Sequence, residues 1–134
     1  MKSLVIDSNV AVRWISSRRM LLEFLKVASV YDVVFSTELA DEYERILCSN
    51  FGLTKQSAHA TVSRFCKLAR KAHVDFSGVG SGMRDPNDEP ILALCIQNKI
   101  DIIVSDDLDF NQKILSPTKL LRSVEFNLIW EGKQ

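Results

Sequence analysis

The stretch Leu4-Val-Ile-Asp-Ser-Asn9 decides the fold of this chain. Three consecutive apolar residues, two of them β-branched, predict a short strand that is buried on both faces and stops at the carboxylate of Asp7. The polar residues that follow are candidate N-caps for a helix that continues through Val10 and Trp14. The first unit is therefore predicted to be a strand, a turn and a helix.

The same alternation recurs along the chain. Apolar runs at 33–35 and 100–104 predict two more buried strands, and helical patterns separate the strands. Short strands separated by helices favour an α/β fold. We expect a central parallel sheet between two layers of helices, that is, a three-layer α/β/α architecture.

Two further segments have recognisable patterns. After the candidate N-cap Thr54, apolar residues recur at spacings of three and four as far as Ala72, which predicts a long amphipathic helix. Near the end, the pair at 120–121 suggests a short helix, and the apolar run Phe126–Trp130 suggests a last strand.

Composition favours one folded domain. The chain has 134 residues, of which 46% are hydrophobic and 25% charged, so one core over residues 1–134 is expected. No window approaches the ~18 uninterrupted apolar residues of a membrane span, and Asp7 comes too early for the apolar segment of a signal peptide. The three dispersed cysteines predict neither a disulfide framework nor a thiolate zinc site. We expect a soluble, cytoplasmic protein without membrane contact.

Acidic residues gather where the predicted strands end. Asp7 follows the first strand and the group Asp106–Asp109 follows the third, and the carboxyl ends of parallel strands meet at one edge of a sheet. Asp88 and one acid of the segment Glu38–Glu44 can join them at helix positions. Clustered carboxylates repel one another unless a cation binds, and oxygen ligands suit Mg²⁺ or Mn²⁺. The alternative is structural, with Asp7 and Asp88 as helix caps and the later group as turn residues.

Basic residues are segregated from the acidic ones. From residue 45 to 84 there are seven bases against one acid, and from 85 to 109 there are seven acids against one base. Arg64, Lys67 and Lys71 share one side of the helix predicted after Thr54, which makes them candidates for contacts with phosphates. The alternative is a solvated face that keeps the helix soluble.

Four blocks of the sequence carry a family resemblance. They are Val5-Ile-Asp-Ser-Asn-Val10, Ser36-Thr-Glu-Leu-Ala-Asp-Glu-Tyr43, Asp85-Pro-Asn-Asp-Glu-Pro-Ile-Leu-Ala-Leu94 and Ile103-Val-Ser-Asp-Asp-Leu-Asp-Phe110. Taken in order, they resemble the signature blocks of the PIN domain. The Asp-Pro-x-Asp form of the third block is most similar to the branch related to VapC-type toxins.

The resemblance implies a PIN-like fold and a metal-dependent ribonuclease that uses Mg²⁺ or Mn²⁺. It implies an acidic quartet of Asp7, Glu42, Asp88 and Asp107. Asp109 is implied as a further metal ligand. Glu42 is preferred over Glu38 and Glu44, which are expected to face solvent, because it stands six residues beyond Ser36 as in the family block. The supporting residues that we predict are Asn9, Ser105 and Asp85. The predicted RNA-binding residues are Arg64, Lys67, Lys71 and Arg84.

The resemblance further implies hydrolysis of RNA phosphodiesters by the toxin of a toxin–antitoxin pair. The expected partners are an RNA substrate, a cognate antitoxin and a second copy of the chain. Apolar helix positions in 20–25 are either one dimer seam or part of the core. Two alternatives stay open: a non-catalytic PIN-fold module that binds RNA or protein, and a PIN nuclease of RNA processing or decay.

Overall fold

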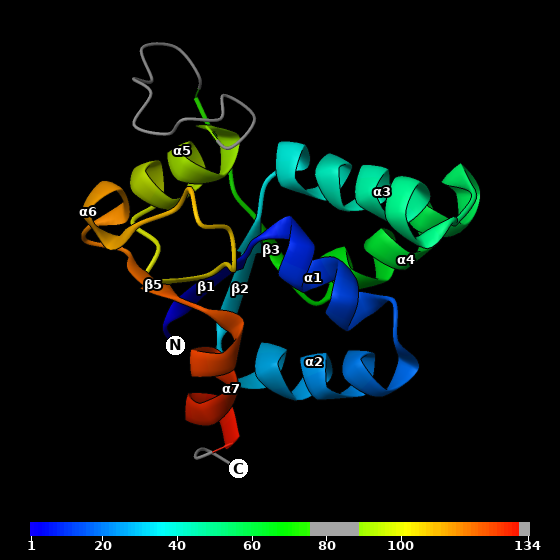
Figure 1. Cartoon of the computed structure of the whole chain (residues 1–134), viewed down its shortest axis with the longest axis horizontal. Helices are drawn as coiled ribbons and strands as arrows, with labels where there is room; N and C mark the ends of the chain where they lie inside the picture. Colours follow the sequence, from blue (N-terminus) through cyan, green and yellow to red (C-terminus); the bar gives the residue numbers. More distant parts are fainter. Residues whose placement is uncertain (76–88, 132–134) are drawn as a thin grey trace.

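A computed structural model describes residues 1–75 and 89–131 of the chain (Figure 1). In these ranges, five parallel strands form a sheet in the order β3-β2-β1-β4-β5. The strands are β1 (Ser3–Ile6), β2 (Asp32–Phe35), β3 (Arg70–Lys71), β4 (Ile102–Val104) and β5 (Lys119–Leu121). The helices are α1 (Ser8–Ile15), α2 (Arg18–Val30), α3 (Thr37–Phe51), α4 (Lys55–Lys67), α5 (Glu89–Gln97), α6 (Gln112–Leu115) and α7 (Ser123–Glu131).

Helices cover both faces of the sheet. Figure 1 shows α1 to α4 on one side of the strands and α5 and α6 on the other. The chain first moves outward from β1 through β2 to β3 and then returns to β4 and β5 on the other side of β1. The predicted three-layer α/β/α fold with a central parallel sheet is thereby confirmed.

The opening stretch folds as its pattern predicts. Leu4, Val5 and Ile6 are fully buried in the central strand, where each buried side chain contributes roughly 1.5–3 kcal/mol relative to exposure. Asp7 has extended backbone angles and is the N-cap of α1. The buried residue Trp14 holds the helix against the core.

An aromatic cluster fixes the helices next to β2. The ring of Phe65 in α4 stacks on Phe24 of α2 at 5.0 Å and lies perpendicular to the ring of Tyr43 of α3 at 5.2 Å. Phe35, at the end of β2, lies 6.3 Å from the same ring. Because one side chain contacts three elements, α3 is held in a fixed position over the end of the sheet.

The helix predicted from Thr54 to Ala72 is shorter than expected. It ends at Lys67, and Arg70–Lys71 pair with β2 as the edge strand β3. The main-chain N–H of Ala72 donates to the Phe35 carbonyl at 2.8 Å. Pairing with β2 satisfies the backbone groups that a longer helix would have satisfied internally. The spacing of the apolar residues therefore could not distinguish a longer helix from a short edge strand.

The types of the last two predicted elements are wrong, because the predicted helix is a strand and the predicted strand is a helix. The pair at 120–121 lies in β5, which extends the sheet beside β4, and Phe126–Trp130 lies in α7. Phe126 and Trp130 are both buried and stand four residues apart, so they share one helix face. The Glu125 carboxylate accepts the N–H of Arg122 at 2.9 Å and caps the first turn.

Two findings bear on the composition-based expectations. Cys48, Cys66 and Cys95 are free thiols. In the described part of the chain, each helix is too short or too polar to cross a bilayer.

Candidate functional site

The topology creates a crevice at the carboxyl ends of β1 and β4. The order of the sheet reverses between these two neighbours, and ligands of parallel α/β sheets bind at such points. Ile6 pairs with Val104, so the residues that follow them, Asp7 and Ser105, leave the sheet side by side. The Asp7 N–H donates to the Val104 carbonyl at 2.9 Å. The acids predicted to converge follow β1 and β4, and the convergence is confirmed for Asp7 and Asp107.

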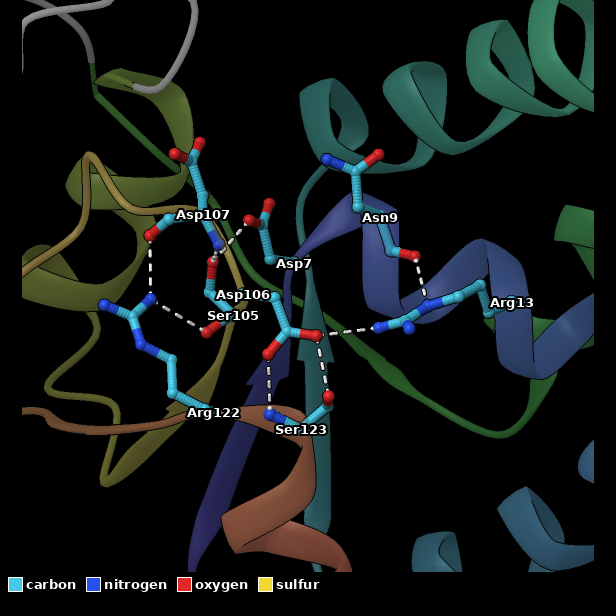
Figure 2. A network of polar contacts seen from close by, with 8 residues as sticks. All are labelled: Asp7, Asn9, Arg13, Ser105, Asp106, Asp107, Arg122 and Ser123. Atoms are coloured by element: carbon cyan, nitrogen blue, oxygen red, sulfur yellow. Dashed lines mark hydrogen bonds and ion pairs between the residues drawn. The ribbon is translucent and has the colours of Figure 1, made fainter.

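A chain of hydrogen bonds joins the two sides of the crevice (Figure 2). Asp7 Oδ1 accepts the Ser8 N–H at 2.8 Å, and Asp7 Oδ2 accepts the Ser105 hydroxyl at 2.6 Å. Ser105 Oγ accepts the Asp107 N–H at 3.1 Å, and Asp107 Oδ1 accepts the Asp109 N–H at 2.9 Å. Ser105 is fully buried and therefore fixes both aspartates.

The Asp7 carboxylate is held in a setting that disfavours its charge. It is 6% exposed, and this burial raises the pKa of Asp7, an effect partly offset by the hydrogen bonds from Ser105 and Ser8. The negative charges of Asp107 and Glu42 raise the pKa further. Among residues 1–75 and 89–131, no lysine or arginine forms an ion pair with Asp7. A cation bound here would relieve the repulsion.

Tyr43 holds the helix that carries Glu42 against the central strand. Its hydroxyl donates to the Ile6 carbonyl, directly before Asp7. Burial first, and then the negative charge of Asp7, hold the pKa of Tyr43 well above its usual range, so the phenol stays neutral and donates. From the sequence, Tyr43 is only one member of an apolar helix face, and nothing in that pattern marks its hydroxyl.

The acids of α3 have different surroundings. Glu42 is half-buried, forms an exposed contact of 3.3 Å with Arg45, and acts by its charge on Asp7. Glu44 contacts His59 Nδ1 at 2.6 Å, and Glu38 lines a groove at the start of the helix. We predicted that both face solvent, whereas both are half-buried in grooves of the surface.

The side chains at the opening point the same way. Figure 2 shows the carboxylates of Asp7 and Asp107 and the amide of Asn9 directed to one side of the sheet edge. Asn9 is exposed at the start of α1, and Asp109 is half-buried. The arrangement offers carboxylate, amide and hydroxyl oxygens to a ligand in the crevice.

Asp106 faces away from this opening and has a structural role. Its carboxylate accepts the N–H and the hydroxyl of Ser123 at 2.8 and 2.6 Å, and it pairs with Arg13 at 2.8 Å. Partial burial is the largest single effect and raises its pKa, but the Ser123 hydrogen bonds and Arg13 together outweigh burial and lower the pKa of Asp106. Asp106 therefore has the structural role of the cap-and-turn alternative and tethers the start of α7 to α1. Asp7 also caps a helix, as that alternative predicted, but its carboxylate lies at the opening as well.

Arg122 is a site-adjacent residue that the sequence did not indicate. Its guanidinium donates to the carbonyls of Ser105 at 3.1 Å, Asp107 at 2.7 Å and Phe110 at 3.0 Å. No motif marks it, because its partners lie 12 to 17 residues earlier in the chain.

The donor set fits a hard divalent cation. In the described ranges no three acidic, histidine or cysteine side chains lie close enough to hold an ion by themselves. Mg²⁺ usually binds through one or two carboxylates and keeps several waters, so Asp7 and Asp107 are a suitable pair. The predicted residues Asp88, Asp85 and Arg84 lie outside the described residues.

The predicted basic side does not form one helix face. Arg64 and Lys67 are exposed on α4, whereas Lys71 is exposed on β3 because the helix ends earlier. Lys71 lines a groove of about 510 Å³ with Thr37, Glu38, Ala72, His73 and Val74.

The sequence model of the PIN domain family matches residues 3–109. The chain therefore belongs to the PIN domain family, and its fold is of the nuclease type. No curated protein matches the chain. The matched region includes Asp7, Glu42, Asp107 and Asp109 and ends before Arg122.

Proposed function

We propose that this chain is a metal-dependent endoribonuclease and that Asp7, Glu42, Asp88 and Asp107 are its acidic quartet, with Asp109 as a further metal ligand. The observation that carries the proposal is the buried Asp7 carboxylate, on which the charges of Asp107 and Glu42 act without a described cation partner. Membership of a nuclease-type family supports it. Because every candidate ligand offers oxygen, Mg²⁺ or Mn²⁺ is the expected ion.

The chemistry would divide between the ion and the chain. When bound, Mg²⁺ or Mn²⁺ lowers the pKa of an attacking water and stabilises the departing oxygen of a phosphodiester. Asp7 and Asp107 would hold the ion, and Ser105 keeps both in place through its hydroxyl. The Asn9 amide, at the same opening, would orient water or a phosphate oxygen. The expected products carry a 5′-phosphate and a 3′-hydroxyl.

The test is cleavage of a mixed RNA substrate by the full chain with Mn²⁺, Mg²⁺ or EDTA, beside Asp88→Asn. We expect cleavage that needs metal and that is lost in the variant. A matched pair on one helix sharpens the test, because Glu42→Gln should lose activity while Glu44→Gln should keep it. Products ending in a 2′,3′-cyclic phosphate would overturn the proposed mechanism.

A non-catalytic module that binds RNA or protein is the second candidate. The observation that favours it is the exposed position of Arg64, Lys67 and Lys71, which could bind a phosphate backbone without any cleavage. If folded protein binds RNA and leaves it intact with either metal, this candidate is the better account. A PIN nuclease of RNA processing or decay would instead differ in which RNA it cuts.

The RNA backbone would be held by Arg64, Lys67, Lys71 and Arg84. Each phosphate contact with single-stranded nucleic acid contributes about 0.7 to the salt slope of binding. Neutralising Arg64, Lys67 and Lys71 together should therefore flatten the slope by about 2. An unchanged slope would remove these three residues from the interface.

The biological role that we propose is the toxin of a toxin–antitoxin pair acting in the cytoplasm. A cognate antitoxin should be encoded in a neighbouring reading frame, and its product should suppress cleavage when added to the purified enzyme. A second copy of the chain would use the exposed side chains Leu22 and Leu25 of α2. Light scattering of Leu22→Asp and Leu25→Asp should then report a smaller particle than the parent protein.

A further inference from the structure

The segment 105–110, which carries Asp107 and Asp109, has neither helix nor strand structure. Its shape therefore depends on groups from other elements. Arg122, the residue after β5, supplies three hydrogen bonds to it. One nitrogen, Nη1, donates to the carbonyls of Ser105 and Asp107 at 3.1 and 2.7 Å, and Nη2 donates to the carbonyl of Phe110 at 3.0 Å. Figure 2 shows the first two of these bonds.

Arg122 is itself firmly placed. Its main-chain N–H donates to the Glu125 carboxylate at 2.9 Å, and its carbonyl accepts the Phe126 N–H at 3.0 Å. Phe126 is buried, so the first turn of α7 anchors the backbone from which the guanidinium reaches. The planar guanidinium has donors in a fixed fork, whereas a lysine ammonium is a point charge on a flexible stem.

The three hydrogen bonds from the Arg122 guanidinium act as a clamp that holds both ends of the segment 105–110 and its centre. Phe110 is fully buried and anchors one end, and Ser105 is fully buried at the other. The backbone of Asp107 is held twice, at its N–H by Ser105 Oγ and at its carbonyl by Arg122. Since Ser105 Oγ also donates to Asp7, the spacing of the two aspartates depends on where Arg122 keeps the segment.

We propose that Arg122 is a positioning residue, which sets the place of the Asp107 carboxylate relative to Asp7 and so determines how tightly the site binds a divalent cation. The part that concerns the cation rests on the proposed function. Arg122 acts through main-chain carbonyls and does not serve as a ligand.

The first experiment follows amide hydrogen exchange in EDTA, which needs neither metal nor activity. Arg122→Lys and Arg122→Ala are compared with Arg13→Ala, which removes one of the donors to the Asp106 side chain in the same segment but leaves the carbonyls of that segment untouched. In both Arg122 variants the amides of Asp107 and Asp109 should exchange about 10-fold faster, because charge-assisted hydrogen bonds that close the segment are lost. Exchange equal to that of Arg13→Ala in both Arg122 variants would overturn the clamp.

The second experiment measures Mn²⁺ affinity from the spin-resonance signal of the free ion, with RNA cleavage followed over the same Mn²⁺ range. Loss of a group that orients a metal ligand typically weakens affinity about 10-fold or more. Half-saturation should therefore rise about 10-fold in both Arg122 variants, and saturating Mn²⁺ should restore their cleavage rate. Asp107→Asn should not be restored. Unchanged half-saturation in Arg122→Lys and Arg122→Ala would reject the positioning role.

The two experiments separate the two proposals. If the parent protein neither binds Mn²⁺ nor cleaves RNA, the proposed function and the metal part of this inference fail together, while hydrogen exchange still decides whether Arg122 clamps the segment. If the parent binds and cleaves and the Arg122 variants behave like it, only the positioning role fails. Arg122→Lys keeps the charge and the stem, so it serves where Arg122→Ala does not fold.

Discussion

Asp106 and Asp107 are neighbours in the sequence, yet the two sides of the segment 105–110 have opposite surroundings. On one side, the Asp106 carboxylate is surrounded by donors from Arg13 and Ser123. On the other side, Asp107 lies with Asp7 at an opening where carboxylates add to one another's negative charge. A carboxylate with its donors in place tethers the fold, whereas carboxylates in mutual repulsion are suited to bind a cation.

The electrostatics of Asp7 and Asp106 express the same difference. Burial, with the nearby charges of Asp107 and Glu42 adding to it, raises the pKa of Asp7 despite two hydrogen bonds. At Asp106 the effect of burial is outweighed by Ser123 and Arg13, and the pKa is lowered. The neighbours, not the residue type, decide which aspartate is structural.

The largest expected effect is a difference in RNA cleavage between variants of Asp7 or Asp107 and a variant of Asp106. Asp7→Asn and Asp107→Asn each remove a charge that we assign to metal binding, and cleavage of RNA with Mn²⁺ should fall at least about 100-fold, equivalent to about 2.7 kcal/mol. Asp106→Asn should stay within a few-fold of the parent. Equal losses in Asp106→Asn and Asp107→Asn, at equal thermal stability, would break the comparison.

The stability of the variants should show the reverse order, with a larger loss at Asp106 than at Asp107. Asp106→Ala removes the cap at the start of α7 and should lower the free energy of unfolding by about 1–2 kcal/mol at pH 7. Urea denaturation in EDTA measures this change. Asp107→Asn, which keeps an oxygen for the Asp109 N–H, is the matched variant and should lose less. A fully stable Asp106→Ala would show that the cap is dispensable.

The pH dependence of stability should have opposite signs for Asp7 and Asp106. The folded-state pKa of Asp7 lies above its ordinary value of 3.8, so the folded state binds the proton more tightly and loses stability as pH rises from 3.8 through that pKa. For Asp106 the folded pKa is lowered, so its contribution is full above 3.8 and is lost as pH falls through the folded pKa.

The variant Asp7→Asn checks the first of these signs. In EDTA at pH 7, Asp7→Asn should be more stable than the parent in urea, and the gain should vanish below pH 3.8. Added Mn²⁺ should stabilise the parent but not the variant. A less stable Asp7→Asn at pH 7 would show that the Asp7 charge is already compensated.

The smallest effect concerns Arg13. Its ion pair with Asp106 is largely exposed, and such pairs contribute about 0–1 kcal/mol. Arg13→Ala should therefore destabilise the protein only slightly, by less than Asp106→Ala, and cleavage should be unchanged. Chemical denaturation at low and high salt measures the difference, which should shrink as salt screens the pair. A loss as large as that of Asp106→Ala would place the stabilisation in the ion pair instead of the cap.

The place of the candidate site was predictable from the sequence because Asp7, Asp107 and Asp109 follow short buried strands. Asp7 and Asp107 come at strand ends, and parallel strands bring those ends to one edge of the sheet. The position of Glu42 came from the family block, and its charge is one of the smaller effects that raise the pKa of Asp7. The pattern gave no way to assign Asp106, since its partner Ser123 is 17 residues away.

The wrong predictions of secondary structure have one physical cause. Ala69 and Ala72 continue a helical spacing, yet the chain leaves the helix at Lys67 because the edge of β2 offers hydrogen bonds to Ala72 and its neighbours. Similarly, Phe126–Trp130 has a composition typical of strands and forms α7. In such segments the local preference is weak, and contacts with other elements decide between helix and strand.

The sequence by itself determined the α/β class, the central buried strand and the set of acids at its edge, because burial and strand polarity follow from the order of apolar and polar residues. Only the tertiary structure decided which neighbour each acid meets. It gave Asp106 its donors, joined Asp7 to Asp107 through Ser105, and brought Arg122 back onto the segment. Hydrogen bonds between residues distant in the chain depend on how elements pack, and no local pattern encodes them.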